Sequence, residues 1–261
     1  MPWIEANGTS FHYKIDGAGP LVILLHELGG TLDSWDGVVP GLAAHYRVLR
    51  YDQRGFGLSE KVRAPYTLET LVDDLQALLR ALAPVGPYHV VSIAAASTQA
   101  LLLMERDPQA VASLVFCNPA PGVDASRAEA LEKIAAQAER EGIRSVLPQM
   151  LDRSYPPELS DRETYDTYRG RYLGNDPVGF ALAFRVLATT DKRASLAKVA
   201  CPALVVGGNQ DVVRPVAGSQ AIAEQIPGAR FAAIDAGHFM PATNPRGLLA
   251  LLLDFFSANA K

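Results

Sequence analysis

The chain has 261 residues, 49% of them hydrophobic, and a formal net charge of −4 at pH 7. Its acidic and basic residues are interspersed rather than grouped, which excludes the basic face that nucleic-acid binding requires. A chain of this length can bury one large α/β core, so we expect a single domain that acts on a small neutral or modestly charged molecule.

The cysteines and the N-terminus give no indication of a metal site, a disulfide framework or a targeting segment. Cys117 and Cys201 are too few for a metal cluster or a disulfide framework and are expected to be buried core residues. No apolar run is long enough to span a bilayer, and residues 1–5 lack a basic-then-apolar signal segment. The sequence therefore predicts a cytoplasmic protein with no membrane contact, no metal and no cofactor.

The first expected elements are an antiparallel hairpin and then the interior of a sheet. Asn7-Gly8 separates two alternating runs, residues 3–5 and 11–15, which indicates a two-residue hairpin turn. Residues 21–25 are apolar without alternation, as in a parallel strand that is covered on both faces.

A glycine-containing loop, residues 26–30 (HELGG), follows this strand directly. A loop at the carboxyl end of a parallel strand can aim backbone N–H groups into a ligand crevice, so Leu28 is the predicted donor to a developing oxyanion. The carboxylate of Glu27 would oppose that charge if it faced the site. We expect Glu27 to brace the loop, with an acid or base role as the alternative. His26 is expected to brace the loop as well.

The next predicted strand, residues 46–51, ends in a charged loop. Asp52 and Arg54 lie close to glycines, and such a pair more often fastens a loop than performs chemistry. Leucines then recur at helical spacing between Leu68 and Leu82, which predicts a crossover helix.

The central stretch of the sequence runs from Tyr88 to Met104, where a β-rich run meets a helix-like run without a loop between them. Only small side chains fit so tight a turn, and residues 92–96 (SIAAA) have the spacing of the G-x-S-x-G nucleophile elbow. Ala94 stands at the nucleophile position and has no nucleophile to offer. Ser92 and Ser97 are expected to serve packing and capping.

After another buried strand, residues 111–118, the pattern predicts a twisted parallel sheet with helices on both faces. From residue 119 to about 194 the strand signal disappears. This predicts a helical cap, residues 119–194, inserted into a core made of residues 1–118 and 195–261. Its expected helices cover residues 127–141, 157–173 and 178–190, and its aromatic residues are candidates for lining a pocket: Tyr155, Tyr165, Tyr168, Phe180 and Phe184.

Two late strands, residues 203–206 and 231–234, are followed by an acid and a histidine. Asp211 follows the first strand and His238 follows the second. A nucleophile position, an acid and a histidine, each just past a parallel strand, stand in the chain order of the α/β-hydrolase triad. The sequence resembles the α/β-hydrolase superfamily, and its segments VLRYDQRGFGLS and LVFCNPA look most like the 3-oxoadipate enol-lactonases and related small esterases.

This resemblance implies an α/β-hydrolase fold and a set of site residues. Ala94 would occupy the nucleophile position, Asp211 and His238 would complete the triad, and the amides of Leu28 and Ala95 would form the oxyanion hole. The side chains expected to contact the substrate are those of Glu27, Trp35, Phe239 and Met240.

Three functions are compatible with these residues. The favoured one is hydrolysis of a small ester or lactone, with Ala94 marking either an inactivated variant or a mechanism in which His238 and Asp211 drive water directly onto the carbonyl. The second is a cofactor-independent lyase or oxygenase that uses the same dyad as a general base, which is an analogy with other proteins of this fold. The third is a non-catalytic receptor, and retention of both dyad residues counts against it.

Overall fold

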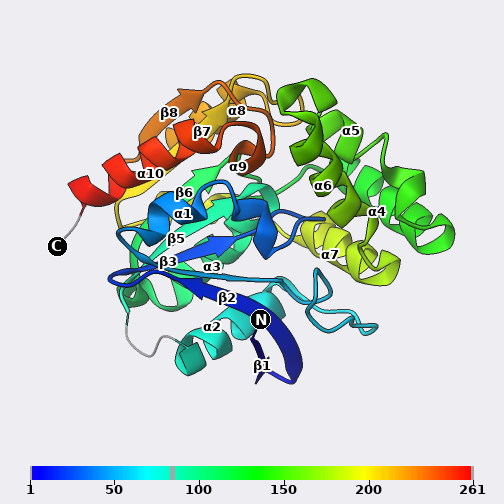
Figure 1. Ribbon diagram of the computed structural model, residues 1–261, viewed down its shortest axis with the longest axis horizontal. Coiled ribbons are helices and arrows are strands. Elements are labelled where there is room, and N and C mark those ends of the chain that lie inside the picture. The colour runs from blue at the N-terminus through cyan, green and yellow to red at the C-terminus, as the bar shows by residue number, and fades with distance from the viewer. Residues whose placement is uncertain (1, 83–85, 260–261) are drawn as a thin grey trace.

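The computed structural model describes residues 2–82 and 86–259. Within these ranges eight strands form one sheet in the order β1-β2-β4-β3-β5-β6-β7-β8 (Figure 1). The pairs β1–β2 and β2–β4 are antiparallel, and the other neighbouring pairs are parallel. The strands are β1 (Trp3–Ala6), β2 (Thr9–Asp16), β3 (Leu21–Leu25), β4 (Arg47–Tyr51), β5 (Tyr88–Ile93), β6 (Val111–Cys117), β7 (Ala203–Gly208) and β8 (Arg230–Ile234).

The antiparallel edge begins with the predicted hairpin between β1 and β2. Asn7 and Gly8 have φ angles of 46° and 69°, the left-handed backbone that the favoured two-residue hairpin turns require. Asparagine and glycine adopt this backbone at a lower steric cost than other residues. The hairpin prediction is therefore confirmed.

Helices cover both faces of the sheet. Alternate residues of β3 belong to different hydrophobic clusters, with Ile23 and Leu25 in one and Val22 and Leu24 in the other. Successive side chains of a strand point to opposite faces, so a strand that is covered on both sides is apolar throughout. The helices are α1 (Val39–Ala43), α2 (Leu68–Leu82), α3 (Ser97–Arg106), α4 (Ala125–Glu141), α5 (Leu151–Ser154), α6 (Arg162–Leu173), α7 (Pro177–Thr189), α8 (Val216–Ala223), α9 (Met240–Thr243) and α10 (Pro245–Ala258).

The register of the central strands decides which loops meet. β5 lies between β3 and β6, and Leu25 at the end of β3 pairs with Ser92 near the end of β5. The loop after β3 and the turn after β5 therefore leave the sheet side by side at its carboxyl edge, where α/β folds bind ligands.

The segment between β6 and β7 carries helices α4 to α7, and its described residues add only an isolated bridge between Gly122 and Asp191 to the β structure. These helices lie together beside one end of the sheet (Figure 1). The guanidinium of Arg185 on α7 joins α7 to α4 through ion pairs with Glu132 at 3.0 Å and Glu139 at 2.7 Å.

The predicted start of one helix in this segment is wrong. The sequence suggests a single helix over residues 157–173, but α6 begins at Arg162, after a short 3₁₀ turn over Pro157–Leu159. The reason is local: the carboxylate of Asp161 accepts a hydrogen bond from the Thr164 N–H and caps α6.

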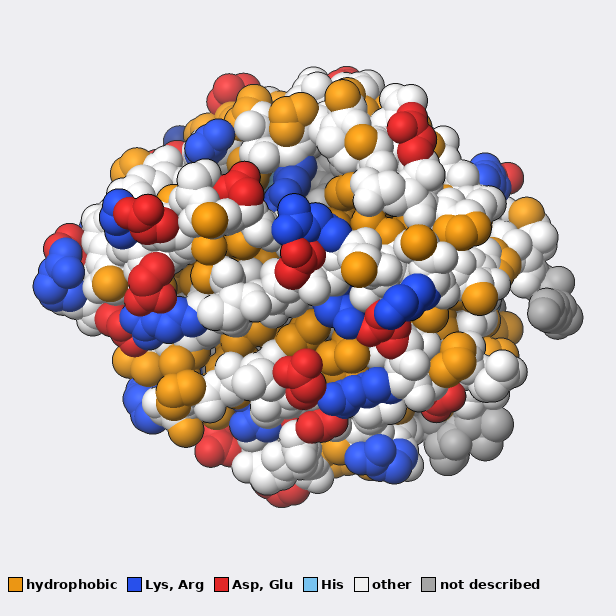
Figure 2. Space-filling view, turned by 180° about the vertical axis from the view of Figure 1, so that it is seen from behind, with side chains coloured by type: hydrophobic (Ala, Val, Ile, Leu, Met, Phe, Trp, Pro, Cys, Tyr) orange, Lys and Arg blue, Asp and Glu red, His pale blue; other side chains and the backbone are white. Residues whose placement is uncertain are grey.

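The surface carries charges of both signs. Figure 2 shows acidic and basic side chains interspersed on the face it displays, in agreement with the sequence. Across the described residues, no helix combines the length and the apolar character that crossing a membrane requires.

Candidate active site

The turn after β5 has the geometry of a nucleophile elbow. Ala94 has a φ of 50°, a left-handed backbone that is uncommon for residues other than glycine, and it begins a short 3₁₀ helix that leads into α3. Such a strained turn lifts the central side chain out of the sheet. Ala94 lines a pocket at this edge of the sheet and presents only a methyl group to it.

His238 and Asp211 form a hydrogen-bonded pair beside this turn. Nδ1 of His238 lies 2.7 Å from Oδ2 of Asp211, and both side chains are buried. The other carboxylate oxygen, Oδ1, accepts from the backbone N–H groups of Val213 at 2.7 Å and Arg214 at 2.8 Å. With Nδ1 directed to the carboxylate, Nε2 is the ring nitrogen left for the pocket, which His238 lines.

Two backbone N–H groups are available to stabilise negative charge at the same place. Leu28 and Ala95 both line the pocket. Ala95 is the second residue of its 3₁₀ helix, where an N–H group has no partner within the helix. The N–H of Leu28 donates to no backbone carbonyl or side chain among the described residues. Both amides can therefore serve as oxyanion donors.

The loop that carries Leu28 is braced by His26. Nε2 of His26 accepts from the Gln53 N–H at 2.9 Å, so Nδ1 carries the proton and donates to the Glu27 carbonyl at 2.8 Å. The Gln53 side chain in turn donates to the His26 carbonyl at 2.7 Å. Gly29, at a φ of 83°, passes so close to the ring of Tyr172 that a Cβ atom would lie 2.3 Å from it. Glycine is therefore required at this position of the loop.

Glu27 faces its own loop and the helical segment. Oε1 accepts from Oγ of Ser34 at 2.7 Å and from the hydroxyl of Tyr168 on α6, which fits the expected bracing role. Burial, and then the charge of Glu27, hold the pKa of Tyr168 well above its usual range, so this phenol donates as a neutral group. Oε2 is buried and has no hydrogen-bond partner among the described residues, and Glu27 also lines the pocket.

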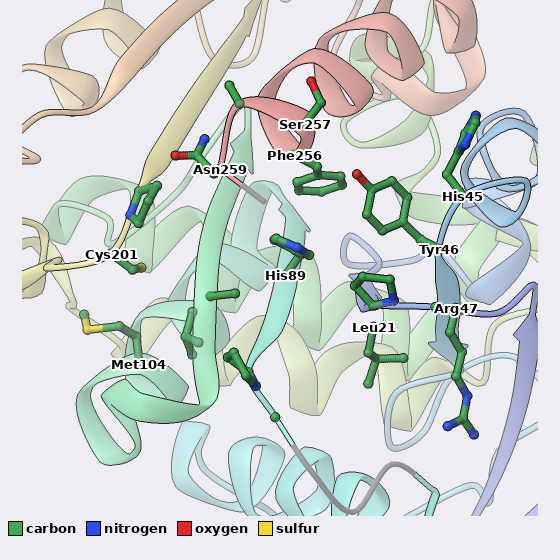
Figure 3. A pocket seen from close by; sticks show the side chains of 18 of the residues that line it. Leu21, His45, Tyr46, Arg47, His89, Met104, Cys201, Phe256, Ser257 and Asn259 are labelled. Carbon is green, nitrogen blue, oxygen red and sulfur yellow. The ribbon is translucent and has the colours of Figure 1, made fainter. Parts of the chain in front are cut away.

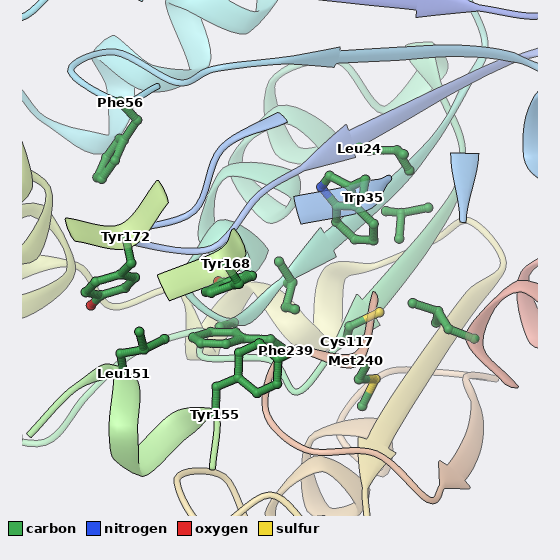
Figure 4. Close-up of a cluster of buried hydrophobic side chains, with 14 of the residues drawn as sticks. Leu24, Trp35, Phe56, Cys117, Leu151, Tyr155, Tyr168, Tyr172, Phe239 and Met240 are labelled. Atoms are coloured by element: carbon green, nitrogen blue, oxygen red, sulfur yellow. The ribbon is translucent and has the colours of Figure 1, made fainter. Parts of the chain in front are cut away.

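The remaining pocket wall is largely apolar. The cavity has a volume of about 60 Å³. Phe239 lines it, whereas Trp35 and Met240 are fully buried in the hydrophobic core and are not among the lining residues (Figure 4). Their indole and thioether pack inside the molecule instead of contacting the cavity. Its lining residues are Glu27, Leu28, Ala94, Ala95, Ala120, Arg127, Leu131, Met150, Ser154, Tyr172, Phe184, Leu187, Val213, Arg214, His238 and Phe239.

Comparison with known proteins identifies the family. A model of the alpha/beta hydrolase fold matches residues 20–245. The chain belongs to the α/β-hydrolase fold family. It is 26% identical over 253 residues to 3-oxoadipate enol-lactonase 2 of Acinetobacter baylyi, a match that covers 93% of this chain and 91% of the relative.

Solved structures of this family superpose over nearly the whole chain. The enol-lactonase from Burkholderia xenovorans LB400 has a TM-score of 0.92 at 28% identity and covers 98% of this chain and 100% of its own. A hydrolase from Pseudomonas aeruginosa PA01 has a TM-score of 0.90 at 31% identity, with coverages of 98% and 97%. The protein is thus an enzyme of the α/β-hydrolase fold, and its resemblance to the enol-lactonases is confirmed.

The two serines beside the elbow and the nearby cysteine of this α/β-hydrolase do not take the place of the missing nucleophile. Oγ of Ser92 donates to the Val115 carbonyl at 3.3 Å, and Oγ of Ser97 accepts from the Ala120 N–H at 3.1 Å. Cys117 is fully buried, and burial raises the pKa of its thiol to about 12, so it stays protonated.

Asn118, just after β6, is a positioning residue that the sequence reasoning missed. Its Nδ2 donates to the carbonyls of Gly237 at 3.1 Å and His238 at 3.0 Å, and its Oδ1 accepts from the Gly208 N–H at 2.9 Å. It therefore ties the histidine loop to the end of β7, whose loop carries Asp211. Its position at the end of a strand, within the LVFCNPA segment, is the feature of the sequence that could have indicated this role.

A second, larger pocket lies away from this chemistry. It has a volume of about 1500 Å³, and its lining includes Leu21, Arg47 and Val111, which begin β3, β4 and β6 (Figure 3). Ligands of α/β folds bind at the opposite, carboxyl edge. Among its lining residues, His89 is hydrogen-bonded to Ser113 at 2.8 Å. The smaller pocket is the one that combines an oriented base with oxyanion donors.

Asp52 and Arg54 hold the loop after β4, as expected. The buried carboxylate of Asp52 accepts from the N–H groups of Leu32 and Leu58, both at 2.8 Å, and contacts Nδ1 of His12 at 2.7 Å. The guanidinium of Arg54 pairs with the buried Asp74.

We expect Asp52→Ala to lower the free energy of unfolding by about 3 kcal/mol or more, because it leaves buried donors without an acceptor. Urea unfolding measures the change. The matched control is Asp73→Ala, whose half-exposed carboxylate pairs with Arg106 and should contribute no more than about 1 kcal/mol. Equal effects of the two substitutions would contradict the structural role of Asp52.

Proposed function

We propose that the protein hydrolyses a small ester or lactone, with His238 acting as a general base on water and without a covalent intermediate. The observation that carries the proposal is the contact of His238 with Asp211 beside an elbow residue, Ala94, that has no hydroxyl. A protein that only bound its ligand would have no need for a histidine oriented in this way.

The proposed reaction uses groups already described. A water molecule above the methyl group of Ala94 gives a proton to Nε2 of His238 while its oxygen adds to the substrate carbonyl. The negative charge on the carbonyl oxygen is stabilised by the N–H groups of Leu28 and Ala95. The intermediate then collapses, the ester C–O bond breaks, and the leaving oxygen takes the proton back from His238.

The helical segment, residues 119–194, is proposed to act as the cap of this site. Its residues contribute much of the pocket wall, including Leu131, Met150 and Phe184. It also holds the loop of the oxyanion donor, because Nδ2 of Asn175 donates to the Gly29 carbonyl at 2.8 Å. Movement of this segment would therefore affect the oxyanion donors as well as access to the pocket.

Proton abstraction from carbon is the second candidate, as in a cofactor-independent lyase or oxygenase. The same absence of a hydroxyl at Ala94 favours it, because a base and two oxyanion donors suffice to form and stabilise an enolate. Such a reaction needs a substrate with an acidic C–H bond, and no attack on the carbonyl takes place.

The two candidates give different products, which allows a direct test. We expect slow turnover of p-nitrophenyl esters and small lactones above the buffer rate, with no acyl adduct on the protein by intact-mass spectrometry. Failure to hydrolyse any member of the panel, together with deuterium exchange at an acidic C–H bond of an added ketone in D₂O, would overturn the hydrolase proposal in favour of proton abstraction.

A further inference from the structure

The carboxylate of Glu27 is satisfied through only one of its two oxygens. Oε1 accepts from Ser34 and Tyr168, whereas Oε2 has no hydrogen-bond partner among the described residues. Glu27 is only 2% exposed, so bulk water does not solvate Oε2. A buried carboxylate oxygen without a donor is costly. The bracing role of Glu27 needs Oε1 and leaves Oε2 unexplained.

Glu27 stands beside the reacting groups of the proposed site. It lines the same pocket as Ala94 and His238. It also directly precedes Leu28, the proposed oxyanion donor, and the Cα atoms of adjacent residues are about 3.8 Å apart. A substrate group that bonds Oε2 is therefore expected close to the carbonyl that reacts.

Tyr172 on α6 also lines this pocket and carries a second polar group without a partner. Its hydroxyl makes no hydrogen bond with another described residue. Tyr172 lies one helical turn beyond Tyr168, which contacts Oε1 of Glu27, and residues four apart share a helix face. Burial, and then the charge of Glu27, raise the pKa of Tyr172 above its usual range, so the phenol is neutral and can donate.

These two groups together fit a hydroxyl. A carboxylate oxygen accepts, a neutral phenol can donate, and a hydroxyl can donate to the first while it accepts from the second. A carboxylate or ketone oxygen on a ligand has no proton to donate to Oε2. An ammonium group could not accept from Tyr172, and its charge would be repelled by Arg127 and Arg214, which line the same pocket.

We propose that Oε2 of Glu27 and the hydroxyl of Tyr172 bind a hydroxyl group of the substrate, so that the protein acts on hydroxy-substituted esters or lactones. This rests on the proposed function for the reacting carbonyl, but the binding itself requires no turnover. A site with a buried acceptor discriminates against an analogue that lacks the matching donor, because the acceptor is then left unpaired. Glu27 and Tyr172 therefore set specificity and take no part in breaking the ester bond.

The test compares lactones in which a methyl group replaces the hydroxyl. The α- or the β-hydroxy-γ-butyrolactone should have a kcat/KM about a hundredfold or more above that of its methyl isostere, with each value divided by the hydroxide-catalysed rate. Glu27→Gln should remove most of this preference, because an amide keeps one oxygen for Ser34 and Tyr168 but puts an NH₂ group in place of Oε2. Tyr172→Phe should reduce the preference while it keeps the ring beside Gly29.

Tyr165→Phe is the matched control, because Tyr165 is a buried tyrosine of the same helix that does not line the pocket. It should leave the preference unchanged. Thermal melts show whether each variant is folded, and Tyr172→Phe carries the test if Glu27→Gln does not fold. Equal loss of preference in Tyr165→Phe, an unchanged preference in folded Glu27→Gln and Tyr172→Phe, or no preference for either hydroxy lactone would overturn the inference.

Binding of a ketone separates this inference from the proposed function, because a ketone cannot be hydrolysed. Ligand-observed NMR titration should show hydroxyacetone binding at least tenfold more tightly than its isostere butanone, an advantage that Glu27→Gln loses. That result supports the hydroxyl subsite even if no lactone is turned over. Conversely, His238-dependent hydrolysis with equal normalised kcat/KM for hydroxy and methyl lactones would leave the hydrolase proposal standing and refute the hydroxyl subsite.

Discussion

Ala94→Ser is expected to give the protein a covalent acyl intermediate and to raise its rate with p-nitrophenyl esters by roughly a hundredfold or more, since a triad nucleophile accounts for several powers of ten in related chemistry. The elbow places residue 94 in the strained backbone that exposes a nucleophile, with a φ of 50°. His238 is held by Asp211 at 2.7 Å, ready to take the hydroxyl proton. The free N–H groups of Leu28 and Ala95 would then stabilise the tetrahedral oxyanion.

Intact-mass spectrometry after brief incubation with the ester checks this expectation, together with a burst of p-nitrophenol. The matched control is Ala120→Ser, which places the same hydroxyl in the same pocket but on the segment after β6 and not at the nucleophile position. A folded Ala94→Ser protein that forms no adduct and shows no burst would count against an ester hydrolase. The space above Ala94 would then be needed for a substrate that loses a proton from carbon.

His238→Ala should lower turnover by about a thousandfold or more under either proposed reaction, because both need a positioned base. Asp211→Asn should reduce turnover less completely, because the ring remains present but loses the carboxylate that orients it. Steady-state rates with the best ester, lactone or ketone substrate measure both effects.

His45→Ala is the matched control for this substitution, since it removes an exposed imidazole that does not line the pocket of Ala94. Circular dichroism shows whether each variant is folded. His238→Gln is a second variant that keeps a side-chain hydrogen-bond donor near Asp211 and should be equally inactive. Full activity in a folded His238→Ala protein would exclude both catalytic proposals.

The elements that sequence reasoning identified well are those decided by local sterics and by periodicity. The turn at Ala94 needs small neighbours whatever surrounds it, so its place could be found from residues 92–96 alone. The strands β3 and β5 are buried along their whole length because helices cover both faces, and β3 is apolar throughout. Asp211 and His238 follow strands in a recognisable order, and the structure brings them into contact.

The residues that were missed or misplaced depend on contacts across long separations. Asn118 bonds the carbonyl of His238, a separation of 120 positions, and Tyr168 bonds Glu27 across 141. Trp35 was expected at the pocket, but its indole is enclosed by the core. Arg127 and Arg214 look like ordinary surface charges in the sequence, and only the fold brings them into one pocket.

By itself, the sequence determined the layered α/β architecture and the elbow with its missing hydroxyl, because both follow from side-chain size or from a repeat of two or 3.6 residues. The order of acid and histidine could also be found from the sequence, because it matches the order of the α/β-hydrolase triad. The tertiary structure alone decided which polar groups are satisfied. Oε1 of Glu27 accepts from Ser34 and Tyr168, whereas Oε2 of Glu27 has no hydrogen-bond partner among the described residues. The hydrogen-bond partner of a polar group is the group that lies next to it in the folded protein, and separation along the sequence does not predict which group that is.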